Sequence, residues 1–201
     1  MFVWIVEGDV LAKALLRNAW EQLQVTLSAH PGWIRSAGGV DGSGHFTGMI
    51  YLTDPQAWSE VAEDDGVKLW LVNVLKHLNA PVSSETPRAS VLIDPMQESA
   101  RFLQFISART SDVERFTAVN DAFQIEVRTH RPDVVGSLIA WFDDDRFVET
   151  VLFTSEQDAR NAESREFPGG IEGLFGELMQ LMQGIDYRDV RDPWLATGKT
   201  E

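Results

Sequence analysis

The chain has 201 residues and is acidic: 31 Asp and Glu face 17 Lys and Arg, and the formal net charge is -14. Its 44% hydrophobic and 24% charged residues are typical of a globular protein and exclude a disordered tail, a collagen-like chain and a coiled coil. The lack of cysteine excludes disulfides, thiolate nucleophiles and cysteine-ligated metals. Excess negative charge argues against a nucleic-acid partner, because binding phosphates requires a cationic surface. No apolar stretch approaches the roughly 18 residues that cross a bilayer, so we expect no membrane partner and a cytoplasmic location.

The two halves of the chain show the same order of hydrophobic patterns when one is shifted on the other by about 100 residues. Each half opens with an apolar run of strand length, Phe2–Val6 in the first and Phe102–Ile106 in the second. An amphipathic helix follows each run, with Asp9 predicted as the first N-cap and Ser111 as the second. The apolar stripes of these helices coincide, and Asn120 is the single polar exception.

A glycine-rich or acidic turn then marks a hairpin in each half, pairing 33–40 with 46–53 and 134–142 with 147–154. A second amphipathic helix and a closing apolar strand end each half. We place the closing strands at 90–93 and 194–196, and interpret 81–88 as turn and 94–100 as linker.

The order of elements per half is strand, helix, strand, strand, helix, strand, which is the ferredoxin-like βαββαβ plan. A sheet with helices on one face leaves its other face bare, and two such units in one chain can cover each other. We therefore predict an α+β protein with units at 1–94 and 101–201, packed sheet to sheet as an intrachain dimeric α+β barrel. The alternative is an unrelated alternating α/β chain whose halves coincide by chance.

The stretch from His30 to Ser59 combines Pro31-Gly32-Trp33 after a helix, a glycine-bearing hairpin and a Thr-Asp-Pro-Gln-Ala-Trp helix start. It resembles the antibiotic biosynthesis monooxygenase-like family. The resemblance implies a tandem duplicated dimeric α+β barrel. It also implies a monooxygenase that needs no cofactor and acts on a hydrophobic, aromatic or polyketide-like molecule.

Aromatic and histidine residues concentrate in the first half, which holds five of seven tryptophans and three of four histidines. We therefore expect a ligand pocket there. Trp70 and His77 lie two turns apart on one helix face, where the second half has leucines. His77 is the predicted catalytic base, because imidazole in an apolar cavity can exchange protons near neutral pH. The alternative is a histidine at the boundary of the core.

The resemblance assigns Arg35 and Tyr51 as partners for a substrate oxyanion, and Trp4, Trp33 and Trp70 as the pocket walls. Arg35 is expected to share a strand face with Trp33. The alternatives are tryptophans that only fill the core and an arginine that faces solvent or an acidic residue.

The competing class is a non-catalytic protein that binds a small molecule or heme, with His77 as heme ligand, or has a purely structural role. We predict neither a cofactor nor a metal, since the acidic runs 63–65 and 143–145 lack the ligand spacing of a calcium loop. The expected assembly is a monomer, as a pseudo-dimer, or a weak homodimer.

Overall fold

The computed structural model describes residues 1–94, 99–165 and 169–198, and forms two compact units. The first unit comprises Met1–Ala89 and Asp192–Glu201, and the second comprises Ser90–Arg191, whereas 1–94 and 101–201 were predicted. Within the described residues each unit has a five-stranded sheet and three helices. The predicted α+β class is confirmed.

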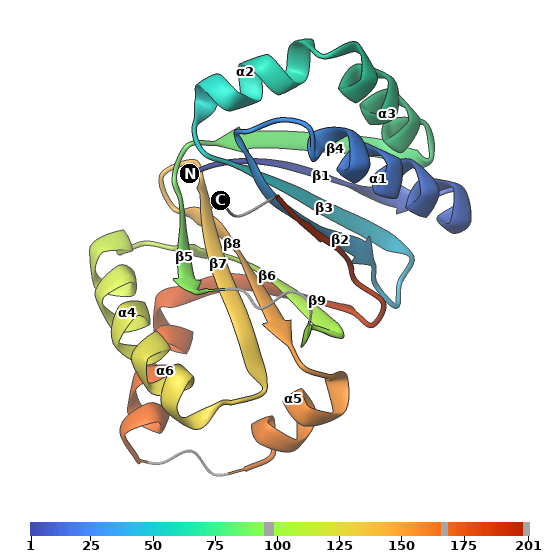
Figure 1. Cartoon of the computed structure of the whole chain (residues 1–201). Helices are drawn as coiled ribbons and strands as arrows, with labels where there is room; N and C mark the ends of the chain where they lie inside the picture. Colours follow the sequence, from blue (N-terminus) through green and yellow to red (C-terminus); the bar gives the residue numbers. More distant parts are fainter. Residues whose placement is uncertain (95–98, 166–168, 199–201) are drawn as a thin grey trace. The chain divides into compact units, whose positions relative to one another are not determined.

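The first unit builds its sheet in the order β10-β2-β3-β1-β4, with every pairing that joins β10, β2, β3, β1 and β4 antiparallel. Helices α1 and α3 cover one face of this sheet (Figure 1). The hydrophobic core of the unit lies between these helices and the sheet. The elements are β1 (Phe2–Val10), α1 (Lys13–Leu27), β2 (Trp33–Val40), β3 (His45–Leu52), α2 (Pro55–Glu63), α3 (Asp65–Lys76), β4 (Leu78–Thr86) and β10 (Trp194–Thr197).

The second unit repeats this plan in the order β5-β7-β8-β6-β9, with α4 and α6 over one face. Its elements are β5 (Ala89–Ile93), β6 (Phe102–Thr110), α4 (Val113–His130), β7 (Val134–Phe142), β8 (Arg146–Phe153), α5 (Glu156–Glu163), α6 (Gly169–Leu181) and β9 (Met182–Val190). The predicted hairpins therefore form in both units.

The two short edge strands are exchanged relative to the prediction. Residues 90–93 do not close the first unit, because β5 lies at the edge of the second sheet. Residues 194–196 do not close the second unit, because β10 pairs with β2 of the first, with Trp194 opposite Gly38. The closing strands are β4 and β9. Most of their side chains are exposed or half-buried, so their polar sequences resemble turns although they lie at sheet edges.

The same β-bulge recurs in both closing strands. The pairing of β1 with β4 shifts between Glu7 and Asp9, and the pairing of β6 with β9 shifts between Ser107 and Arg109. Opposite these shifts the closing strands place a residue with positive φ, Ala80 at 46° and Gly184 at 61°. Pro81 follows Ala80 in the bulge, where a proline does not break a continuous ladder.

The helix starts differ from the predicted caps. Asp9 lies inside β1, opposite His45, and α1 begins only at Lys13 after Ala12. In the second unit Asp112, not Ser111, caps α4 by accepting a hydrogen bond from the backbone N–H of Arg115. Both helices start later than predicted because each opening strand runs four residues beyond its apolar core, where it stays paired with its neighbouring strands.

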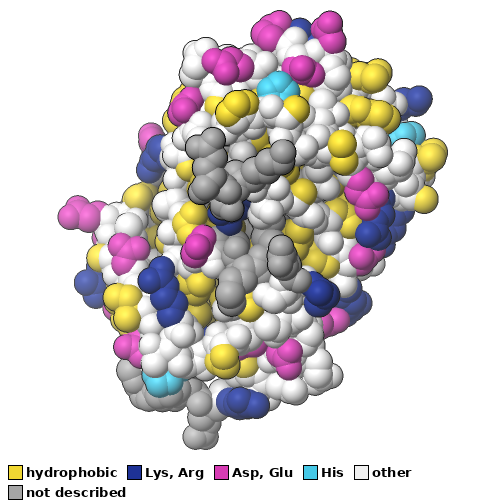
Figure 2. All heavy atoms as spheres, in the orientation of Figure 1, with side chains coloured by type: hydrophobic (Ala, Val, Ile, Leu, Met, Phe, Trp, Pro, Cys, Tyr) yellow, Lys and Arg dark blue, Asp and Glu magenta, His cyan; other side chains and the backbone are white. Residues whose placement is uncertain are grey.

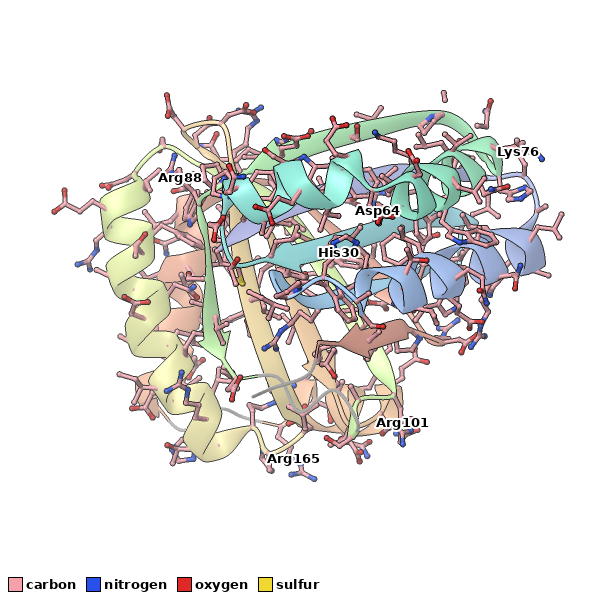
Figure 3. The ribbon with its side chains drawn as sticks, turned by 45° about the horizontal axis from the view of Figure 1, so that its top comes forward. His30, Asp64, Lys76, Arg88, Arg101 and Arg165 are labelled. Carbon is pink, nitrogen blue, oxygen red and sulfur yellow. The ribbon has the colours of Figure 1, made fainter. Side chains whose placement is uncertain are left out.

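The end of α1 and the start of α3 are joined by a side-chain contact in the first unit. His30 Nε2 lies 3.7 Å from Asp64 Oδ2, and the two side chains point toward each other in Figure 3. Asp64 also caps α3 by accepting the backbone N–H of Val67 at 2.9 Å. His130, at the equivalent end of α4, pairs with Glu126 on its own helix. Both histidines therefore serve helix ends.

Candidate functional site

A cavity of about 530 Å³ lies in the second unit, between its sheet and helices α4 and α6. Cavities that bind small molecules typically measure about 300 to 1,000 Å³. Most of the wall is apolar and partly aromatic, and the apolar and aromatic residues of the wall are Ile106, Phe116, Phe123, Val127, Val134, Val151, Phe153, Phe175, Leu178, Met182 and Tyr187. The cavity is therefore large enough for a small aromatic molecule and suited to its hydrophobic surface.

A carboxyl group projects into this cavity from the middle of the sheet. Glu149, on β8, accepts hydrogen bonds on Oε1 from Ser137 Oγ at 2.6 Å and from Gln124 Nε2 at 3.2 Å. The Gln124 amide also donates to Asn120 Oδ1 at 3.3 Å. Burial raises the pKa of Glu149, and the hydrogen bonds from Ser137 and Gln124 oppose that rise in part.

A second group of polar side chains lines the same cavity as Glu149. Gln104 Nε2 donates to Asp189 Oδ1 at 2.8 Å, and Arg160 forms ion pairs with Asp189 and with Glu163. The Arg160 guanidinium also lies 5.5 Å from the centre of the Phe102 ring. The single guanidinium of Arg160 thus lies between two carboxylates, so this end of the cavity carries net negative charge.

Arg131, the other basic residue of the wall, is held by Asp133 through two hydrogen bonds of 2.9 and 2.7 Å. Both side chains of this pair are largely buried. The two arginines of the cavity are thus already paired, and the geometry favours an uncharged ligand over a carboxylate or a phosphate.

In the first unit the equivalent space is filled by a tryptophan. The strand registers align Gly48 with Glu149, since Gly48 lies opposite Val6 and Glu149 opposite Ile106. Trp20 aligns with Asn120 on the preceding helix and is fully buried. A Cβ atom added to Gly48 would lie 2.6 Å from the Phe46 ring and 2.8 Å from the Trp20 ring, so the indole and the phenyl ring together occupy the volume that a side chain at this position would need.

The hydrogen-bonding pair beside Glu149 is present in both units. Gln24 Nε2 donates to Ser36 Oγ at 2.9 Å and to the Trp194 carbonyl at 3.1 Å. Gln24 aligns with Gln124, and Ser36 aligns with Ser137. The first unit therefore combines this pair with a large indole and a glycine, and the second combines it with a small amide and a carboxylic acid. The second combination leaves a cavity beside an ionisable group.

The three predicted pocket tryptophans lie in or against the core of the first unit. Trp4 and Trp33 are buried there, and Trp70 packs against the same cluster. Trp4 also stacks on Trp58, with ring centres 5.6 Å apart. The structure brings these residues together on the helix-covered side of the sheet.

The predicted oxyanion partners lie on the opposite face of that sheet. Arg35 is opposite Tyr51 in the pairing of β2 with β3, and the Tyr51 hydroxyl lies 3.4 Å from Met49 Sδ. The expectation that Arg35 shares a face with Trp33 is wrong, because a β-bulge between them reverses the alternation of faces. The second unit has the same bulge, between Val134 and Gly136.

His77 caps the C-terminal end of α3. Its backbone N–H donates to the Val74 carbonyl at 3.1 Å, and its own carbonyl accepts the N–H of Leu11 at 2.9 Å. These bonds give its backbone a role in joining α3 to the segment before α1. Its catalytic role, like those of Arg35 and Tyr51, stays a prediction.

Sequence reasoning missed Glu149, Ser137 and Gln124. One available signal was Asn120, the polar residue in an otherwise apolar stripe. A second signal was the alignment of Glu149 with Gly48 when the two hairpins are superimposed. It places an acidic residue at a position where the first unit has no room for a side chain.

No protein-family model and no curated protein sequence matches the chain. Solved structures do match it over nearly its whole length. A protein provisionally named a monooxygenase from Lactobacillus acidophilus NCFM has a TM-score of 0.78 at 10% identity, covering 98% of this chain and 96% of the other. A similarly named protein from Fusobacterium nucleatum has a TM-score of 0.74 at 10% identity, covering 98% and 94%.

An anthrone oxidase-like protein matches with a TM-score of 0.65 at 8% identity, covering 99% of this chain and 94% of the other. At these identities the likeness concerns the fold. The chain therefore shares its fold with these monooxygenase-named proteins, and the predicted resemblance to the antibiotic biosynthesis monooxygenase-like family is confirmed at the level of the fold.

Among the described residues, no helix is both long and apolar enough to cross a bilayer. In the same part of the chain, no group of three or more acidic or histidine side chains is arranged to hold a metal ion.

Proposed function

We propose that the chain is a monooxygenase-like enzyme whose substrate is a hydrophobic aromatic or polyketide-like molecule, bound in the cavity of the second unit. The observation that carries the proposal is the cavity itself, which combines aromatic walls with the carboxyl group of Glu149 in a fold shared with monooxygenase-named proteins. The paired state of Arg131 and Arg160 supports an uncharged substrate.

The proposed reaction needs only the substrate and dioxygen. Loss of a proton from a CH₂ group next to an aromatic ring or a carbonyl leaves a carbanion, which transfers electrons to dioxygen and forms a carbon–oxygen bond. The resulting hydroperoxide loses water to give a carbonyl, so that R₂CH₂ and O₂ become R₂C=O and H₂O. The protein's part is to orient the substrate, exclude water and move the proton.

The sequence offers a competing location for this chemistry. There His77 is the base, Arg35 and Tyr51 bind the oxyanion, and the tryptophans of the first unit form the walls. The close packing of Trp20 against Gly48 favours the second unit, because the position that corresponds to Glu149 is closed in the first.

Oxygen consumption in the presence of anthrones and quinols tests the proposal. We expect substrate-dependent uptake of one O₂ per carbonyl formed, and we expect His77→Ala to retain it. Loss of uptake in a folded His77→Ala variant would move the site to the first unit. Binding of these compounds without any uptake would identify a non-catalytic binding protein, and a Soret band after addition of heme would identify a heme protein.

A further inference from the structure

The chemical role of Glu149 goes beyond the location of the pocket. Resting on the proposed function, we propose that Glu149 is the catalytic base of the second unit. It takes a proton from an uncharged substrate on Oε2, while Ser137 and Gln124 act as positioning residues on Oε1. The substrates that fit are neutral aromatic molecules with an acidic O–H, or with a C–H next to a carbonyl.

The hydrogen bonds determine which oxygen is reactive. Ser137 on β7 and Gln124 on α4 both donate to Oε1, so the carboxyl group is held from the sheet and from the helix layer at once. Neither of these bonds uses Oε2, and Glu149 lines the cavity. The carboxylate is thus fixed in orientation and keeps one oxygen to accept a proton, which is the geometry of a general base.

The surroundings of Glu149 make it a stronger base than an exposed carboxylate. Apolar residues of β6, β8, α4 and α6 form most of the cavity wall, and burial among them disfavours the charged form. The ionisable side chains of the wall, from α5, β9 and the end of α4, are Arg131, Arg160, Glu163, Tyr187 and Asp189. Arg131 is ion-paired with Asp133, and Arg160 is shared by Glu163 and Asp189, so neither arginine neutralises Glu149 and the pair of acids on Arg160 leaves net negative charge.

The first unit provides an internal comparison. Gln24 and Ser36 repeat the positioning pair there, but Gly48 supplies no carboxyl group and Trp20 fills the space above it. The carboxylate is therefore found in the copy that has the cavity, and the closed copy lacks it. If Ser137 and Gln124 had a purely structural role, the carboxylate and the cavity would not need to occur in the same unit.

The proton step balances without any further reactant. The substrate's H–O or H–C bond breaks, its electron pair stays on the substrate, and a new O–H bond forms at Glu149 Oε2. In the oxygenation the resulting acid returns the proton to the peroxide oxygen, which restores the carboxylate. No electron passes through Glu149.

Anaerobic mixing with a hydroxyanthracenone tests this assignment, because the absorbance of the substrate anion can be followed without any oxygen chemistry. We expect the wild-type chain to bind the compound and to form the anion. The Glu149→Gln variant should bind with similar affinity and form the anion at least about 100-fold more slowly. Glu172→Gln, on the exposed side of α6, is the matched control and should behave as wild type.

Ser137→Ala separates positioning from catalysis. The Ser137 hydrogen bond lowers the pKa of Glu149, so its removal should shift the rise of the anion-formation rate to higher pH. Ser137→Thr, which keeps the hydroxyl, should restore the wild-type profile. A profile unchanged in Ser137→Ala would overturn the positioning role.

The outcomes distinguish the two proposals. Wild-type binding without the anion, or anion formation in Glu149→Gln at the wild-type rate, would overturn the role of Glu149 and leave the binding site intact. Anion formation without oxygen uptake in air would overturn the oxygenase function and support Glu149. Failure to bind would overturn the proposed function, and the Glu149 assignment with it.

Discussion

Glu149 should make the stability of the chain depend on pH. Burial raises its pKa in the folded chain above the unfolded value of about 4.3. The folded state therefore holds the proton more tightly. The stability this gives is complete below the unfolded pKa and is lost as pH rises through the folded pKa. We expect the free energy of unfolding of the wild type to fall relative to Glu149→Gln over that window.

Urea unfolding at a series of pH values measures this difference. Glu172→Gln is the control for the change in net charge, because both substitutions remove one carboxylate from the chain. A difference between wild type and Glu149→Gln that stays constant across the window would show that Glu149 has an ordinary pKa.

At the residue scale, the sequence predicted side-chain types better than their directions. The tryptophans of the first half are clustered as expected, but they fill the core, which hydrophobicity alone does not distinguish from a pocket wall. The sheet face on which the Arg35 side chain lies depends on a one-residue bulge, and no residue pattern in β2 predicts that bulge. Glu149 was not predicted because a single acid in an apolar strand becomes significant only beside Gly48 and Trp20.

At the scale of elements, the exchange of edge strands makes a direct prediction. Trp194 is 2% exposed, stacks on Phe46 at 5.6 Å, and accepts the Gln24 hydrogen bond through its carbonyl. We expect Trp194→Ala to destabilise the chain by about 3–5 kcal/mol, the usual cost of removing a buried indole. Hydrogen exchange should then accelerate in β2 and β3, although β10 follows the second unit in sequence.

A matched truncation after Gly198, which leaves β10 in place, should have little effect on exchange in these strands. Acceleration confined to β7, β8 and β9 on Trp194→Ala would instead assign the last strand to the second sheet, as the sequence order suggested.

The strands and helices with strong internal patterns were predicted well. The hairpin strands were placed within one residue of β2, β3, β7 and β8, because alternating hydrophobicity and turn residues define them locally. The polar edge strands β4 and β9 were missed, since an exposed strand shows no apolar alternation. The partners of β5 and β10 depend on pairing over long sequence distances, which local patterns do not specify.

At the scale of the whole molecule, the two units share more than their order of elements. Both have a bulge after the first residue of the first hairpin strand, in β2 and in β7. Both also have a bulge in the closing strand where it pairs with the opening strand, in β4 and in β9. These shared irregularities support duplication of one module, since bulges are inserted at specific positions. The packing of the two bare sheet faces against each other stays a prediction.

The surface agrees with the acidic composition. On the face shown in Figure 2, acidic and basic side chains of the described residues are interspersed, and basic side chains do not gather into one patch. The formal net charge of the chain is -14.

The central claim is that the second unit holds an open site and that Trp20 and Gly48 close the equivalent site in the first. The double substitution Asn120→Trp and Glu149→Gly transfers the closed pair into the second unit. We predict that calorimetry will find hydroxyanthracenone binding weakened at least about tenfold in this variant, while its circular dichroism and melting temperature show a folded chain. Binding at wild-type affinity by the folded double variant would contradict the claim.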